Sequence, residues 1–188
     1  MYRQVLRTTR RGLGVHLGQR PGFFSASGGR MRTILFVCTG NLCRSPMAEG
    51  FLKRRLTLEG RDGEFRVRSA GTWAVDSAPA SSHAVQVMAE RGVDISDHRT
   101  HDLTPEDVEA ADLILTMTTG HAQAISQSWP AQRRKVHLLS EMVGRRYDVE
   151  DPYGDSIEVY RACADEIEAL IEGGYARILE LAAGQSDT

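Results

Sequence analysis

Short apolar runs alternate along most of this chain with segments of helical period. The apolar runs cover residues 33–37, 65–70, 112–117 and 135–139, and the helical segments between them include 46–56, 81–91 and 120–128. The first run is continuous and rich in β-branched and aromatic residues, which is typical of a strand buried on both faces. Strands that alternate with helices favour right-handed crossovers and a parallel sheet. The pattern predicts a single doubly wound α/β domain with a four-stranded parallel sheet flanked by helices.

Capping residues indicate where several of these helices begin. Ser45 and Pro46 have the order of an N-cap followed by the first helical residue, and Thr104 with the proline after it repeats this order. Asp155 and Glu158 have the spacing of a capping box. Apolar residues then recur with a period of 3.6, at Tyr160, Cys163, Ile167, Leu170, Ile171, Ile178 and Leu179. The last helix is therefore expected to pack one apolar stripe on the sheet, with Cys163 as a core residue.

The composition is that of an ordinary globular protein. The chain has 188 residues, of which 41% are hydrophobic and 26% charged, and its net charge is −2. This size suffices for one domain with a full core. We expect no nucleic-acid partner and no membrane span, because no apolar run approaches the roughly 18 residues that a membrane helix requires. Three cysteines without a disulfide spacing favour a reducing compartment, which we take to be the cytoplasm.

The first 30 residues differ from the rest. They contain six arginines and no acidic residue, and they end in a loop-like stretch rich in glycine and serine. Their composition overlaps that of organellar transit peptides, but a disordered leader or a start codon assigned too early, with Met31 as the working start, is the plainer interpretation. The domain is expected to span residues 31–183, with residues 184–188 as a disordered tail.

A Cys-x5-Arg stretch follows the first predicted strand and leads into the first predicted helix. It places Cys38 at one end and Arg44 at the other, with Gly40 between them to let the backbone turn and point successive N–H groups inward. A helix N-terminus favours an anion and a thiolate, so Cys38 is expected to be a thiolate nucleophile opposite an arginine, in a loop that can hold a tetrahedral oxyanion. The plainer alternative is a buried strand cysteine followed by a solvated arginine.

The string Val-Cys-Thr-Gly-Asn-Leu-Cys-Arg-Ser-Pro-Met-Ala-Glu resembles the phosphate-binding loop of the low-molecular-weight protein tyrosine phosphatases. That family also contains bacterial protein-arginine phosphatases and arsenate reductases, and the resemblance extends over residues 31–181. It implies a phosphocysteine mechanism without metal or cofactor. The loop residues expected around the phosphate are Thr39, Gly40, Asn41, Leu42, Cys43, Arg44 and Ser45. Ser45 is also placed to hydrogen-bond the Cys38 sulfur.

An Asp-Pro-Tyr triplet in the acidic, turn-rich segment 148–155 resembles the acid loop of the same family. By that match Asp151 becomes the proton donor, and Tyr153 joins the residues that contact the substrate. Pro152 makes the chain rigid directly after the acid, which suits a carboxyl group that must be aimed. The alternative is a solvated acidic turn with no catalytic part.

Two further residues are assigned weaker roles. Trp73 follows the second predicted strand, and because strand ends border the ligand crevice of open parallel sheets, it is a candidate wall of the active site. The alternative is a core or surface aromatic. His98 matches a histidine that in the family supports the loop asparagine, here Asn41; the alternative is an exposed loop histidine.

The predicted function is hydrolysis of phosphotyrosine in proteins by a monomer or weak dimer. Leu42 favours this substrate, because the phosphoarginine branch of the family carries threonine there. Protein-arginine phosphatase is the alternative, since Thr39 and the stretches around the two loops look closer to that branch. An arsenate reductase, which needs a further cysteine pair in mid-chain, and a non-catalytic phosphate-binding adapter are less favoured. Cys43 lies near enough in sequence to form a protective disulfide with oxidised Cys38.

Overall fold

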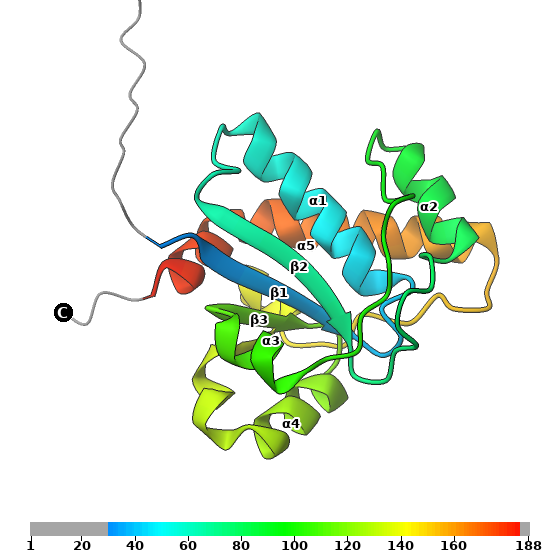
Figure 1. Cartoon of the computed structure of the whole chain (residues 1–188). Coiled ribbons are helices and arrows are strands. Elements are labelled where there is room, and N and C mark those ends of the chain that lie inside the picture. The colour runs from blue at the N-terminus through cyan, green and yellow to red at the C-terminus, as the bar shows by residue number, and fades with distance from the viewer. Residues whose placement is uncertain (1–29, 185–188) are drawn as a thin grey trace, which may run out of the picture.

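The structure is a computed structural model that describes residues 30–184, and it contains one parallel four-stranded sheet between two layers of helices (Figure 1). The strands are β1 (Arg32–Cys38), β2 (Phe65–Gly71), β3 (Leu113–Thr116) and β4 (Val136–Leu138). Their order across the sheet is β2-β1-β3-β4, and each neighbouring pair is parallel. The predicted fold is therefore confirmed. The expected leader and tail lie outside the described residues, apart from Arg30 and Gly184 at their inner ends.

Across residues 30–184, five α-helices and two short 3₁₀ helices connect and cover the strands. They are α1 (Arg44–Leu58), α2 (Ser82–Ala89), α3 (Pro105–Ala110), α4 (Thr119–Ser128), η1 (Pro130–Lys135), η2 (Leu139–Val143) and α5 (Ile157–Ala183). α1, α2 and α5 lie on one face of the sheet, and α3 and α4 lie on the other (Figure 1). Within the described part of the chain, none of the helices is both long and apolar enough to cross a membrane.

The central strand β1 contributes to both cores, as its apolar run predicts. Ile34 and Phe36 are buried with α1 and α5, whereas Leu35 and Val37 are buried on the opposite face with residues of α3 and α4. The alternation follows from the period of two along a strand. Because the sheet is parallel, β1 and β3 end at the same edge, and the chain leaves β1 there at Cys38.

The capping predictions are partly wrong. α1 begins at Arg44 after Cys43, so Ser45 lies inside the first turn instead of capping it. α5 follows Ser156, and the capping box of Asp155 and Glu158 does not form, because Glu158 lies only two residues after the N-cap. Thr104 does cap α3, in a capping box with Asp107. In α1 the helix begins two residues earlier than predicted, directly after the loop that precedes it.

Candidate active site

The loop between β1 and α1 surrounds the sulfur of Cys38. Cys38 is the last residue of β1 and is only 3% exposed, and α1 begins six residues later with its N-terminus toward the loop. The hydroxyl of Ser45, in the first turn of α1, lies 3.0 Å from the Cys38 sulfur. A hydroxyl and a helix N-terminus near a sulfur both stabilise the thiolate form.

Asn41 gives the loop its turn. Its φ of 54° lies in the left-handed region, which asparagine tolerates better than most residues, whereas Gly40 does not adopt such a φ. The expectation that Gly40 makes the turn is therefore corrected. The buried Asn41 amide donates to the hydroxyls of Ser45 and Ser69, both at 2.9 Å, and its oxygen accepts from the His101 N–H at 2.9 Å. The side chain holds the loop from behind and does not line the cavity.

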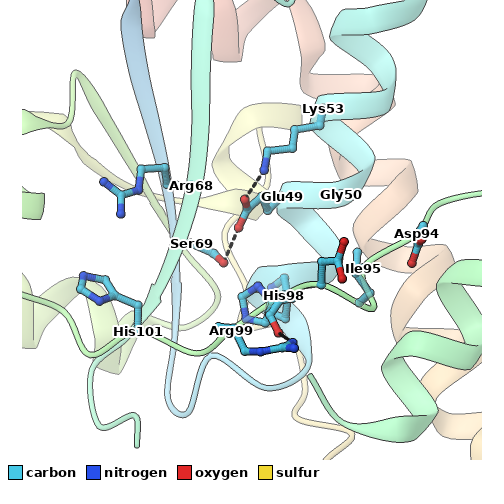
Figure 2. A pocket seen from close by; sticks show the side chains of 12 residues that line it. Glu49, Gly50, Lys53, Arg68, Ser69, Asp94, Ile95, His98, Arg99 and His101 are labelled. Atoms are coloured by element: carbon cyan, nitrogen blue, oxygen red, sulfur yellow. Dashed lines mark hydrogen bonds and ion pairs between the residues drawn. The ribbon is translucent and has the colours of Figure 1, made fainter. Parts of the chain in front are cut away.

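A polar network supports Asn41 on the side of α1. Figure 2 shows the hydroxyl of Ser69 pointing to Glu49, to which it donates at 2.6 Å, and Lys53 pairing with the same carboxylate. His98 donates from Nε2 to the backbone oxygen of Asn41 at 2.9 Å. Burial lowers the pKa of His98, so the ring is mainly neutral near pH 7. The sequence placed His98 beside Asn41, and the contact is made to the backbone of Asn41.

Gly71 is a loop-shaping residue that the sequence reasoning missed. A Cβ atom at Gly71 would lie 2.5 Å from the Thr39 backbone oxygen and 3.0 Å from the Asn41 nitrogen. The end of β2 can therefore approach the loop only because position 71 has no side chain. The following residues then donate to the loop backbone, Thr72 to Cys38 and Trp73 to Thr39, both at 2.9 Å. A glycine at a strand end was the available signal.

Arg44 is 3% exposed and is held at both ends of its guanidinium. Nη1 donates to the backbone oxygen of Val149 at 3.0 Å, and Nη2 pairs with the carboxylate of Asp151. Among the described residues, Nε of Arg44 has no hydrogen-bond partner although it is buried. An unsatisfied buried donor on a charged group is costly, and an anion in the loop would satisfy it.

Asp151 lies on a well-anchored stretch. The Val149 N–H donates to Met117 at the end of β3 at 2.8 Å, and the thiol of Cys163 lies 3.7 Å from the Glu150 oxygen. The carboxyl group itself is 43% exposed and accepts from the Tyr153 N–H at 3.3 Å. The chain up to residue 150 is thus fixed, and the acid at position 151 reaches the loop while still in contact with solvent.

One cavity of about 250 Å³ brings most of the expected residues together. It is lined by Cys38, Thr39, Gly40, Leu42, Cys43, Asp151 and Tyr153. Tyr153 is 65% exposed and stands at the rim. Trp73 is 84% exposed and does not line the cavity, so its expected place in the wall is corrected. Its N–H is used to hold Thr39, and its side chain is left in solvent.

His121, at the start of α4, is a second residue that the sequence reasoning missed. Its Nε2 lies 3.0 Å from the Thr39 hydroxyl and its Nδ1 lies 2.8 Å from the Thr118 hydroxyl. Burial, and next the positive charge of Arg44, lower the pKa of His121 to about 4. The ring is therefore neutral near pH 7 and adds no second positive charge. A lone histidine at a helix start carries no sequence signal for this position.

The other two cysteines are buried thiols. The Cys43 sulfur lies 3.3 Å from both the Ser81 and the Tyr160 hydroxyls, and burial raises the pKa of Cys43. Burial also raises the pKa of Cys163 to about 12. Both are therefore protonated at neutral pH. Cys38 is the cysteine that lies at the start of the loop, facing the N-terminus of α1.

Cys38 and Cys43 line the same cavity, and the predicted protective disulfide between them can be tested by oxidation. Mild peroxide is expected to convert the Cys38 thiolate to a sulfenic acid, and the Cys43 thiol then displaces water to form a disulfide. Mass spectrometry after peroxide treatment should find this disulfide, and a reductant should restore activity. Cys43→Ala should instead accumulate the irreversible sulfonic acid at Cys38. A lasting sulfonic acid in the unmodified protein, without any disulfide, would contradict protection.

A small anion-sized cavity with a buried thiol in its wall fits enzymes that transfer a phosphoryl group to sulfur. A family model described as low molecular weight phosphotyrosine protein phosphatase matches residues 33–181. A protein-arginine-phosphatase from Geobacillus stearothermophilus is 43% identical over 140 residues, which are 74% of this chain and 90% of that protein. A probable low molecular weight protein-tyrosine-phosphatase, EpsP, from Ralstonia nicotianae is 38% identical over 151 residues, 80% of this chain and 99% of that protein.

Among solved structures, a Cys-to-Ser mutant of the YwlE arginine phosphatase with a phosphorylated active-site serine has a TM-score of 0.73. It is 42% identical, and the match covers 79% of this chain and 95% of that one. This chain therefore belongs to the low-molecular-weight phosphotyrosine protein phosphatase family. It is a hydrolase that acts on phosphorylated proteins.

Proposed function

We propose that this chain hydrolyses phosphotyrosine in proteins through a phosphocysteine formed on Cys38. The main support is the shared cavity, in which the Cys38 sulfur, Leu42 and the Asp151 carboxyl group meet. The sulfur attacks phosphorus, while the loop N–H groups and the buried Arg44 guanidinium hold the phosphate oxygens. The sulfur and the loop are positioned before the substrate arrives, which lowers the entropic cost of the reaction.

Asp151 acts as acid and then as base. An incoming phosphate dianion competes with the Asp151 carboxylate for Arg44, and this competition frees the acid to turn toward the leaving group. The released carboxylate takes up a proton from solvent, and the protonated acid then gives that proton to the phenol oxygen as the P–O bond breaks. The carboxylate then takes a proton from the water that attacks the phosphocysteine, and inorganic phosphate and the Cys38 thiolate are released. Ser45, 3.0 Å from the sulfur, stabilises that thiolate.

Leu42 favours phosphotyrosine as the substrate. Its side chain lines the cavity, where an apolar group packs well on a phenol ring. Protein-arginine phosphatase is the second candidate, because the relative from Geobacillus stearothermophilus carries that name at 43% identity. A threonine hydroxyl at position 42 would suit a guanidinium better than leucine does, since it offers a hydrogen bond. The residue at this position is therefore expected to select between the two substrates.

The substrate is tested with two peptides of one sequence, one bearing phosphotyrosine and the other phosphoarginine. The unmodified protein should show a kcat/KM for phosphotyrosine at least about tenfold higher. Leu42→Thr should move the ratio toward phosphoarginine, whereas the control Leu58→Thr, at an exposed position far along α1, should leave it unchanged. A preference for phosphoarginine in the unmodified protein would reverse the assignment without changing the site chemistry.

The remaining expectations stay predictions. A nucleophile that works as a free thiol suits a reducing compartment such as the cytoplasm, and we propose a monomer or weak dimer. An arsenate reductase is disfavoured because Cys163 is buried in α5 and no cysteine lies between it and Cys43. A non-catalytic adapter is disfavoured because it would not need Asp151 beside the loop.

A further inference from the structure

The first turn of α4 contacts both of the stretches that carry the reacting groups. One contact goes to the phosphate loop through Thr39, the neighbour of Cys38, and the other goes to Asp148, three residues before Asp151. The helix itself starts directly after β3, whose end pairs with the end of β1. The same short segment therefore lies between the nucleophile and the acid.

The contact to the acid-bearing stretch is made by one carboxylate oxygen of Asp148. It accepts from the backbone N–H of Thr119 and from the Thr119 hydroxyl, both at 2.7 Å. The backbone hydrogen bond from Thr119, followed by the side-chain one, lowers the pKa of Asp148, so the group is a carboxylate at neutral pH. A carboxylate at a helix N-terminus is also favoured by the helix dipole. Asp148 is therefore held firmly although it is largely exposed.

The contact to the phosphate loop is made by His121. Its two ring nitrogens lie between the hydroxyls of Thr118 and Thr39, and Thr118 also caps α4 by accepting from the His121 N–H at 3.3 Å. The Thr39 hydroxyl faces Arg44 as well, with Nη2 at 3.5 Å. A chain of contacts thus runs from the cap of α4 through His121 and Thr39 to the guanidinium.

We propose that the first turn of α4 is a bridge that sets the position of Asp151 relative to Cys38, with Asp148 and His121 as its positioning residues. Asp148 fixes the approach of the acid, and His121 fixes Thr39 and through it the phosphate-binding guanidinium. The inference rests on the roles proposed above for Cys38, Arg44 and Asp151. It adds two residues that do not touch the substrate and that act on different steps of the reaction.

The two ends of the bridge make different predictions. Asp148→Ala should lower kcat/KM by about tenfold to a hundredfold for phenyl phosphate, whose leaving group needs a proton, and far less for p-nitrophenyl phosphate. Asp148→Asn keeps an oxygen that accepts from Thr119 and should recover most of the loss. His121→Phe keeps the ring but loses both hydrogen bonds, so it should weaken inhibition by inorganic phosphate by a few-fold to about tenfold for either leaving group.

The control is Asp94→Ala, because the Asp94 carboxylate also accepts a backbone N–H, from Ser96 at 2.8 Å, but lies outside the catalytic cavity. Asp94→Ala should change neither kcat/KM for the two aryl phosphates nor the inhibition by inorganic phosphate. The thermal unfolding of each variant is measured first, so that every assay is run below the temperature at which that variant unfolds. An equal loss for both leaving groups in Asp148→Ala, or an unchanged rate, would overturn the bridge. A failure of the phosphocysteine mechanism itself would appear instead as substantial turnover by Cys38→Ser, so the two failures are distinguishable.

Discussion

Cys38→Ser is expected to lower turnover of an aryl phosphate by about 10⁴-fold or more, because a serine hydroxyl at this position is a far weaker nucleophile than a thiolate. Binding of inorganic phosphate should remain within a few-fold, since the loop N–H groups and Arg44 are untouched. The measurement is kcat with p-nitrophenyl phosphate, together with the inhibition constant of phosphate or its heat of binding.

The matched control is Cys163→Ser. Cys163 is also a buried cysteine, and a serine hydroxyl there could still donate to the Glu150 oxygen that the thiol faces. Its activity should stay close to that of the unmodified protein. Substantial turnover by Cys38→Ser that persists when the variant is purified further would mean that water or another residue attacks phosphorus.

Asp151→Asn is expected to lower kcat/KM for phenyl phosphate by about 10²- to 10⁴-fold, because an amide cannot donate the proton that the leaving oxygen requires. The KM should change little. Inorganic phosphate should bind at least as tightly as before, since the carboxylate that pairs with Arg44 has been removed. Steady-state kinetics on phenyl and p-nitrophenyl phosphate, with phosphate inhibition, checks all three.

Asp155→Asn is the control, because Asp155 is an exposed carboxylate in the same turn-rich segment, outside the cavity lining. Its kinetics should match those of the unmodified chain. An unchanged rate in Asp151→Asn would place the acid elsewhere. A fall in kcat with kcat/KM unchanged for both leaving groups would assign Asp151 to the hydrolysis of the phosphocysteine instead of its formation.

The sequence alone predicted the sheet and the loop that carries Cys38 and Arg44, because both depend on local signals. The run around Phe36 has apolar residues for two cores, and Cys38 and Arg44 lie on one continuous stretch whose spacing fixes their relation. Asp151 was located by resemblance of a triplet, and it lies beside Arg44 although more than a hundred residues separate them in sequence. Nothing local in the sequence dictates that meeting.

The parts that were missed or wrong depend on contacts between distant segments. Trp73 follows a strand end as expected, and its N–H binds the Thr39 backbone oxygen, but its side chain is exposed to solvent. His121 and Asp148 meet the catalytic loops only once β3 and α4 are packed beside β1. Ser45 has a residue type typical of an N-cap, yet the helix begins two residues earlier than predicted, and the Ser45 hydroxyl contacts the Cys38 sulfur instead. The residue pattern therefore predicted which segments form helices and strands, whereas contacts in the folded protein determined where those helices and strands begin and end.

The central claim is that the phosphoryl group passes through the sulfur of Cys38. Rapid acid quenching of the unmodified protein during turnover of a phosphotyrosine peptide, followed by peptide mass spectrometry, measures this directly. The account predicts one phosphoryl group on the peptide that contains Cys38, present during turnover and lost when substrate is exhausted. A phosphoryl group on another residue, or turnover without any phosphorylated Cys38, would contradict it.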